Sequence, residues 1–249
     1  MLIDAHCHID MCKEPAEKVV AGDILIVTNG TNLQSNKKVL AYAEMFPNVR
    51  AAMGLYPSHA IENSAKENAA TLKFIEKNKK KIIAVGEVGI DFYHIKDSKD
   101  QKKEINEFKK LIQLANKIKK PLIVHSRKAI NESMDLLKAA KVPVVMHCFE
   151  GNALQTEEAI KRGYYCTIPA NFWTRKGFKN TARRVPIDRL ITETDSPWLS
   201  PIEGENRPQN VKYAISRLAE LKEMSDAQVR IQIWQNFVKV FNIQEKLNN

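Results

Sequence analysis

The feature that most constrains the fold is a repeated alternation of short β-branched apolar runs with longer amphipathic stretches. Such alternation is typical of parallel strands joined by helices. The predicted strands are residues 2–6, 23–28, 49–55, 82–87, 121–125, 143–147, 164–168 and 190–194. The main predicted helices are residues 35–46, 65–79, 99–118, 129–140, 156–162, 176–185, 210–223 and 225–241. Eight strands with interleaved helices in 249 residues predict an α/β fold, a single-domain (β/α)8 TIM barrel over residues 1–249, rather than an open doubly wound sheet.

Polar side chains lie at the ends of five of these strands. His6 and His8 are two residues apart, so on an extended segment both imidazoles point to the same side. The others follow strands four, five, six and eight: Glu87, His125, His147 and Asp195. The C-terminal ends of barrel strands meet at one face, where active sites are built. Four imidazoles and two carboxylates gathered there without a cation would be costly to desolvate. The sequence therefore predicts a divalent-metal site.

The chain is basic, with 39 lysines and arginines against 29 acidic residues and a net charge of +10. Such a charge favours polyanionic partners. However, the dense lysine runs at 77–81 and 117–120 end predicted helices, where cations suit the helix C-terminus, and they lie on the opposite face of the barrel. Basic residues that follow strands are Arg127, Lys128, Arg175, Lys176, Lys179 and Arg207. The charge is therefore modest support for an anionic substrate.

Other classes of protein are disfavoured. No apolar run approaches the roughly 20 residues that cross a bilayer, and the N-terminus begins a strand where a signal peptide would be basic and then apolar. The four cysteines are scattered, without zinc or disulfide spacing. Neither a Walker A loop nor a Rossmann glycine fingerprint is present. We expect a cytoplasmic protein, a monomer, that does not contact membranes.

At the motif level the chain resembles the TatD family of metal-dependent deoxyribonucleases, within the amidohydrolase superfamily. The matching motifs are Asp4-Ala5-His6-Cys7-His8, Gly86-Glu87-Val88-Gly89-Ile90-Asp91-Phe92, Pro121 through Arg127, His147-Cys148-Phe149, Val185 through Arg189, Glu193 through Pro197, and Asn206-Arg207-Pro208. Together they span essentially the whole chain. The resemblance implies a TIM barrel of the metal-dependent hydrolase type.

The resemblance also implies a set of ligands for two divalent metal ions, whether Zn, Mn or Mg. His6 and His8 would bind one metal with Asp195, His125 and His147 would bind the second, and Glu87 would bridge both. Related amidohydrolases often have a carbamylated lysine at the bridging position, so Glu87 points toward the TatD branch.

Three positions depart from the family pattern. Tyr56-Pro57 stands where the family usually has His-Pro, and Lys128 stands where an acid often follows His-Ser-Arg. The segment Asn171-Phe172-Trp173 replaces a loop that commonly begins differently. These departures leave the expected metal ligands intact, so we expect them to affect substrate preference more than chemistry.

The resulting hypothesis is a TatD-type deoxyribonuclease, a 3′–5′ exonuclease that cleaves phosphodiester bonds of single-stranded or frayed DNA with a metal-bound hydroxide. Asp195 and Glu87 are its catalytic residues, with Asp195 orienting or deprotonating the water. Arg127 and Arg207 are its predicted substrate-binding residues. One alternative is a small-molecule amidohydrolase (amidase, lactonase or phosphoesterase), which predicts a closed pocket without surrounding cations. The other is a noncatalytic binding protein, which would normally have lost ligands.

Further residues receive weaker expectations. Asp91 and Glu193 lie beside the ligands, where we expect them to hold imidazoles or backbone in place. His59 and His94 follow strands three and four and could reach substrate, although a solvated loop histidine is the commoner state. Trp173 and Trp198 could stack on a base or pack within the protein.

Overall fold

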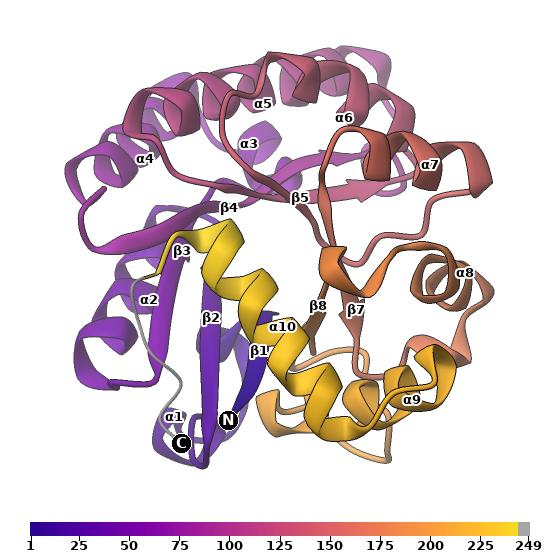
Figure 1. Ribbon diagram of the computed structural model, residues 1–249. Coiled ribbons are helices and arrows are strands. Elements are labelled where there is room, and N and C mark those ends of the chain that lie inside the picture. Colours follow the sequence, from indigo (N-terminus) through magenta and orange to yellow (C-terminus); the bar gives the residue numbers. More distant parts are fainter. Residues whose placement is uncertain (244–249) are drawn as a thin grey trace.

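Eight parallel strands form one sheet in the computed structural model, which describes residues 1–243 (Figure 1). Neighbours in the sheet follow the chain order from β1 to β8, as expected of a (β/α)8 TIM barrel. The strands are β1 (Leu2–Cys7), β2 (Ile24–Gly30), β3 (Val49–Met53), β4 (Ile82–Asp91), β5 (Leu122–Arg127), β6 (Val144–Met146), β7 (Tyr165–Pro169) and β8 (Leu190–Glu193). The predicted barrel is confirmed.

Helices connect the strands and surround them (Figure 1). They are α1 (Ala16–Val19), α2 (Leu33–Met45), α3 (Pro57–Glu62), α4 (Ala65–Lys77), α5 (Ser98–Ile118), α6 (Ile130–Leu136), α7 (Ala153–Lys161), α8 (Lys176–Arg184), α9 (Val211–Lys222) and α10 (Asp226–Phe241). Short 3-10 helices are η1 (Ile9–Met11), η2 (Leu137–Ala139), η3 (Phe172–Thr174), η4 (Ile187–Arg189) and η5 (Pro208–Asn210). None of the helices in residues 1–243 is long and apolar enough to cross a membrane.

The predicted and observed elements differ in a few places. Strand β4 continues past Glu87 to Asp91, with an irregular register against β5 between Val85 and Val88. The helix predicted at 129–140 ends as an α-helix at Leu136 and closes with one 3-10 turn. The short helices α1 and α3 were not predicted, since four to six residues carry too little periodicity to recognise.

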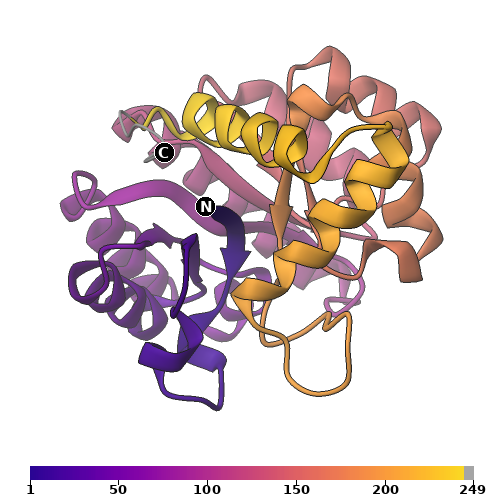
Figure 2. The same ribbon diagram turned by 60° about the horizontal axis from the view of Figure 1, so that its bottom comes forward.

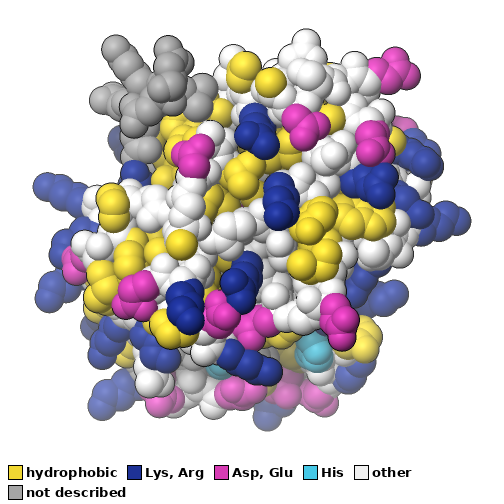
Figure 3. All heavy atoms as spheres, turned by 90° about the horizontal axis from the view of Figure 1, so that it is seen from below, with side chains coloured by type: hydrophobic (Ala, Val, Ile, Leu, Met, Phe, Trp, Pro, Cys, Tyr) yellow, Lys and Arg dark blue, Asp and Glu magenta, His cyan; other side chains and the backbone are white. Residues whose placement is uncertain are grey.

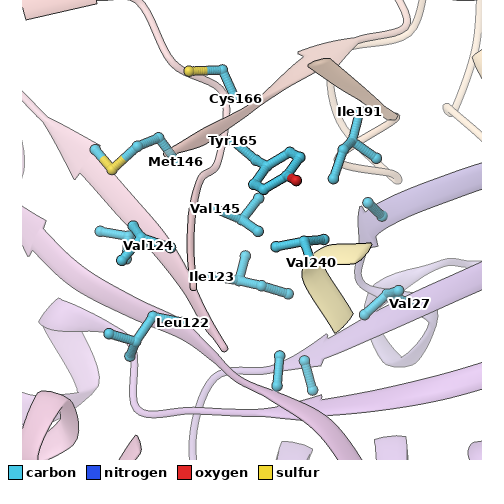
Figure 4. Close-up of a cluster of buried hydrophobic side chains, with 14 of the residues drawn as sticks. Val27, Leu122, Ile123, Val124, Val145, Met146, Tyr165, Cys166, Ile191 and Val240 are labelled. Carbon is cyan, nitrogen blue, oxygen red and sulfur yellow. The ribbon is translucent and has the colours of Figure 1, made fainter. Parts of the chain in front are cut away.

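The core fills the barrel and the layer between the strands and the helices. Apolar side chains from strands around the barrel meet there, as Figure 4 shows for Val27, Ile123, Val145 and Ile191. Most strand residues are buried on both faces, which explains why the strands read as continuous apolar runs.

The two ends of the barrel are used differently. Helix α10 lies at the end where the strands start, because Asn236 donates hydrogen bonds to the carbonyl oxygens of Ile187 and Leu190, at 2.7 Å each. At the other end, the segment after β1 and the loop after β8 lie side by side (Figure 2). They are joined by the Lys13 amide, which donates to Glu205 at 2.8 Å. The C-terminal ends of the strands therefore face these loops.

Candidate metal centre

Six side chains from five strands converge at the C-terminal end of the barrel. His6 lies in β1, His8 directly after it, Glu87 in β4 and His125 in β5, whereas His147 and Asp195 follow β6 and β8. His6, His8, Glu87 and His147 are buried. The structure thus brings together the six residues that the sequence predicted as ligands.

One group of potential ligand atoms includes the Nε2 atoms of His6 and His8, which are 3.1 Å apart. Oε2 of Glu87 lies 3.7 Å from the first and 3.3 Å from the second. Oδ1 of Asp195 lies 3.6 Å from each. The four atoms therefore face a common point.

The other oxygen of Glu87 faces a second group. Its Oε1 atom lies 3.0 Å from Nδ1 of His125 and 3.8 Å from Nε2 of His147. The same His147 nitrogen is 3.9 Å from Asp195 Oδ1, and its ring stacks on that of His6. One carboxylate thus lies between two sets of imidazoles, which is the arrangement expected of a bridging ligand.

These distances fit divalent cations. Ligand atoms about 2.0–2.2 Å from a tetrahedral ion lie roughly 3–4 Å from one another, and the groups His6–His8–Glu87, His6–His147–Asp195 and Glu87–His125–His147 each bring their atoms within 4.8 Å. Nitrogen and carboxylate donors of this kind suit Zn and Mn, and Mg less well.

The second nitrogen of three of the histidines is held by a partner. Nδ1 of His8 lies 2.9 Å from the Asn29 carbonyl oxygen, and Nδ1 of His147 lies 2.7 Å from Glu193 Oε2. Nε2 of His125 lies 3.1 Å from Asp91 Oδ2. Each contact places a proton on the outer nitrogen and leaves the inner one free to bind a cation. Asp91 and Glu193 thus lie where the sequence placed them, beside the predicted ligands.

Burial and mutual pairing shift the pKa values of the cluster in both directions. Burial lowers the pKa of His6 well below its usual value, so its imidazole is neutral. Burial alone would raise the pKa of Glu87, but hydrogen bonds with His125 and His8 hold it well below the usual range. Burial raises the pKa of Asp195 to about 6. Burial lowers the pKa values of His125 and His147, but their contacts with carboxylates outweigh it and raise them to about 8 and about 10. Neutral imidazole and ionised carboxylate are the forms that ligate metals, so a cation bound here would displace these protons.

Asp91 is the centre of a hydrogen-bond network behind His125. Its Oδ2 atom accepts from the Tyr56 hydroxyl at 2.9 Å and lies 2.7 Å from Nδ1 of His94. The Asp91 amide donates to Oε2 of the buried Glu104 at 3.1 Å. Sequence reasoning noted Tyr56 only as a departure from the family pattern, and it missed Glu104, which lies inside helix α5 with no distinguishing motif.

Two close backbone approaches position this part of the sheet. A Cβ atom on Gly54 would lie 2.2 Å from the Glu87 carbonyl oxygen, and one on Gly89 would lie 1.9 Å from that of His125. Gly89 also has a φ of +149°, which side chains rarely adopt. Only glycine therefore lets β3, β4 and β5 approach so closely beside Glu87 and His125.

A cavity of about 970 Å³ opens over the cluster and is lined by five of the six residues, because His6 is fully buried behind them. Its lining includes Arg127, Lys128 and Arg175, so three of the predicted basic residues face it. The Arg127 guanidinium lies 3.8 Å from the centroid of the Tyr93 ring. Arg207, predicted to bind substrate, does not line the cavity and instead pairs with Glu14 at 2.6 Å. Neither Lys176 nor Lys179 is part of the lining.

The remaining candidates divide between the cavity and the rest of the fold. His59, His94 and Trp198 line the cavity. The two histidines are not simply solvated, because Nδ1 of His59 lies 3.0 Å from the Thr31 carbonyl oxygen and His94 pairs with Asp91. Trp173 packs against Phe172 instead, and it does not line the cavity.

Cys7 and Cys148 occupy different surroundings. The buried thiol of Cys7 faces the Val27 carbonyl oxygen, on the side of β1 away from His6 and His8. Cys148 forms with His147 and Glu193 a further group of potential ligand atoms. Burial raises the pKa of the Cys148 thiol well above its usual value, so it favours the neutral, non-ligating form.

Comparison with known proteins gives a consistent picture. Residues 3–242 match the family described as TatD related DNase. An uncharacterized metal-dependent hydrolase of Methanocaldococcus jannaschii is 33% identical, with 96% of each chain covered. The uncharacterized metal-dependent hydrolase YabD of Bacillus subtilis is 32% identical, over 98% of this chain and all of the relative.

Solved structures share the fold. The Escherichia coli TatD homologue YJJV superposes with a TM-score of 0.85 at 24% identity, covering 97% of this chain and 98% of that one. A TatD family hydrolase from Entamoeba histolytica gives a TM-score of 0.82 at 18% identity, covering 96% and 97%.

The contact between Glu193 and His147 gives a first prediction. Both Glu193 oxygens accept hydrogen bonds, one from Nδ1 of His147 and one from the Cys148 amide at 2.9 Å. In Glu193→Gln the amide NH2 group would face one of these donors. We expect metal affinity to fall about 10- to 100-fold, measured by competition with a chromophoric chelator. Glu132→Gln, on an exposed glutamate of the cavity lining, is the control. Unchanged affinity in Glu193→Gln would contradict the positioning role.

Glu104 gives a prediction about pH. Burial raises its pKa from 4.5 to about 7. The pKa of Glu104 is therefore higher in the folded protein than in the unfolded chain. Its protonation contributes stability that is fully present below pH 4.5 and is lost as the pH rises through 7. Glu104→Gln cannot ionise, so it should raise the melting temperature at pH 8 but not at pH 4.5. The gain is at most about 3 kcal/mol, or roughly 6–12 °C.

The control for this measurement is Glu157→Gln, on an exposed glutamate of α7. It should change the melting temperature little at either pH. An equal effect of Glu104→Gln at both pH values would show that ionisation of Glu104 does not affect folding.

Proposed function

This chain belongs to the TatD-related DNase family and is a metal-dependent hydrolase, and we propose that it hydrolyses phosphodiester bonds of DNA as a 3′–5′ exonuclease. The observation that carries the proposal is the position of three cationic side chains, Arg127, Lys128 and Arg175, on the walls of the cavity that five of the convergent residues line. A phosphodiester is the anionic substrate that such a cavity suits. The family's name agrees with this substrate.

We assign the six residues to two divalent cations. His6, His8 and Asp195 would hold one, His125 and His147 the other, and Glu87 would contact both through its two oxygens. When bound, a pair of cations lowers the pKa of a water molecule and neutralises charge on a phosphoryl oxygen.

Asp195 is the residue we assign to proton transfer. Its side chain is 18% exposed and lines the cavity, whereas the other carboxylate of the cluster, Glu87, is 4% exposed. A carboxylate at the cavity floor can orient the attacking water and accept its proton. Its backbone is fixed, because the Asp195 amide donates to the His6 carbonyl oxygen at 2.9 Å.

Arg127 is the residue we assign to the substrate phosphate. Its planar guanidinium can donate two parallel hydrogen bonds to nonbridging oxygens. Tyr93 supports it from below, so the group is positioned before substrate arrives. The alternative small-molecule hydrolase predicts a closed pocket without cations, and the walls of this cavity carry three.

Metal removal gives the direct test of the function. Metal-stripped protein should leave end-labelled single-stranded DNA intact, and addition of Zn, Mn or Mg should restore stepwise shortening from the 3′ end. Asp195→Asn should slow cleavage about 10²- to 10⁴-fold, the usual contribution of a general base. If folded, metal-loaded protein cleaves no DNA with any of these metals, the nuclease assignment is wrong.

The Arg127 assignment is tested by comparing two substrates. Arg127→Ala should lower kcat/KM for a phosphodiester about 10- to 150-fold, the range for a hydrogen bond to a charged group, and leave a neutral carboxylic ester unaffected. Arg207→Ala is the matched control, because that arginine pairs with Glu14 away from the cavity. Equal losses on both substrates would remove the phosphate-binding role of Arg127.

A further inference from the structure

Trp198 is an aromatic residue of this site that is half exposed. The chain contains three tryptophans, at positions 173, 198 and 234. Trp234 is buried in α10, and Trp173 lies under the Arg217 guanidinium, 5.5 Å from its ring centroid. Trp198 is the one that lines the cavity. Single exposed apolar side chains are common on protein surfaces, so the informative property of Trp198 is its position in the lining of this cavity.

The backbone of Trp198 is held firmly although its ring is exposed. Its amide donates to the Asp195 carbonyl oxygen at 2.9 Å, and its own carbonyl oxygen accepts from Nδ2 of Asn206 at 2.6 Å. Asn206 is fully buried and also donates to the Thr194 carbonyl oxygen. The indole therefore projects from a fixed point and loses little freedom when it binds a ligand.

The Trp198 ring also lies next to the proposed ligands. Its centroid is 5.4 Å from that of His8, with the rings inclined at 66°. Two further apolar side chains, Met11 and Leu199, line the same cavity. A flat group that covered the indole would thus lie within one nucleotide of the cluster.

The other exposed aromatic of the cavity, Tyr93, has a different role. Arg127 lies 3.8 Å from its ring centroid, and the Lys96 ammonium lies 5.2 Å from the same point. Its ring is therefore engaged by cations and supports Arg127. Among the described residues, no cation lies over the Trp198 ring in the same way, so its face can accept a base.

We propose that Trp198 forms a nucleobase subsite, in which the indole stacks on the base adjacent to the scissile phosphate of a single-stranded end. The inference rests on the proposed function. It joins two kinds of wall in one cavity: an apolar aromatic surface for a base, and cations for the phosphate chain. Base–aromatic stacking of this kind tolerates any sequence. Bases inside a duplex are covered by their neighbours, so the subsite selects unpaired ends.

The test measures binding of short labelled oligonucleotides to metal-loaded full-length protein in the Asp195→Asn background, where cleavage is slow. Adding Trp198→Ala should weaken binding about 5- to 150-fold, the range for loss of one stacked base. Trp198→Phe keeps a stacking ring, so it should retain most of the affinity while losing the tryptophan fluorescence quench that accompanies binding. Trp173→Phe should change neither the affinity nor the quench.

A second comparison changes the DNA instead of the protein. Two oligonucleotides would each carry one abasic residue, at the last or at the next-to-last position. For protein that retains Trp198, the abasic residue at the stacking position should weaken binding by the same factor as Trp198→Ala does with intact DNA. This discrimination should disappear in Trp198→Ala. Protein that retains Trp198 should bind a blunt duplex more weakly than a single strand, whereas Trp198→Ala should not show this preference.

The outcomes separate the subsite from the function. If the Trp198→Ala protein binds and cleaves single-stranded DNA like the unaltered protein, the base subsite is wrong and the nuclease assignment stands. Equal affinity for intact and abasic ends, or for single strands and blunt duplexes, would likewise overturn it. If metal-loaded protein neither binds nor cleaves DNA, the proposed function is wrong, and the base subsite that rests on it is wrong as well.

Discussion

The site depends on the Glu87 carboxylate, which is buried between two sets of imidazoles. Each of its oxygens faces a different group, with His8 at 3.3 Å on one side and His125 at 3.0 Å on the other. A buried carboxylate is costly unless it is paired, so the imidazoles, or the cations they would share with it, are needed to keep it ionised. Its backbone cannot shift to relieve the crowding, because Gly54 and Gly89 pack directly against β4 and β5. The centre is therefore defined by the sheet as much as by its ligands.

The sequence was sufficient to predict the barrel and the convergence of six residues, because both depend on regular features. Alternating apolar runs mark the strands, and parallel strands must end on one face, so residues as far apart as His6 and Asp195 can be placed together without a structure. Contacts made by loops were not predictable in this way. Arg207 and Trp173 come after predicted strands in the sequence, as Arg127 and Trp198 do, yet Arg207 pairs with Glu14 and Trp173 packs on Phe172. The direction of a loop side chain depends on local turns that carry no periodic signal.

Net charge proved a poor guide to the site. The face drawn in Figure 3 mixes lysines and arginines with acidic and apolar side chains. The runs 77–81 and 117–120 follow α4 and end α5, directly before β4 and β5, at the end of the barrel away from the cavity. Three cationic residues in the lining, rather than the total of +10, bear on the substrate. The remaining lysines and arginines are explained by favourable interactions with helix C-termini and by their contribution to solubility.

Several residues around the cavity have a strained backbone conformation. Seven non-glycine residues in the described part of the chain have a positive φ, and four of them line the cavity: Lys128, Cys148, Asp195 and Leu199. Each such residue costs about 1–2 kcal/mol relative to an ordinary conformation. Strain of this kind persists where the surrounding structure fixes it and commonly marks functional sites. At Asp195 it accompanies a backbone hydrogen bond to His6, so the turn after β8 directs one carboxylate toward β1 and places Trp198 three residues further on. One strained turn positions both the Asp195 carboxylate and the Trp198 indole. A change that relaxed this turn would therefore move the proposed general base and the proposed stacking surface together.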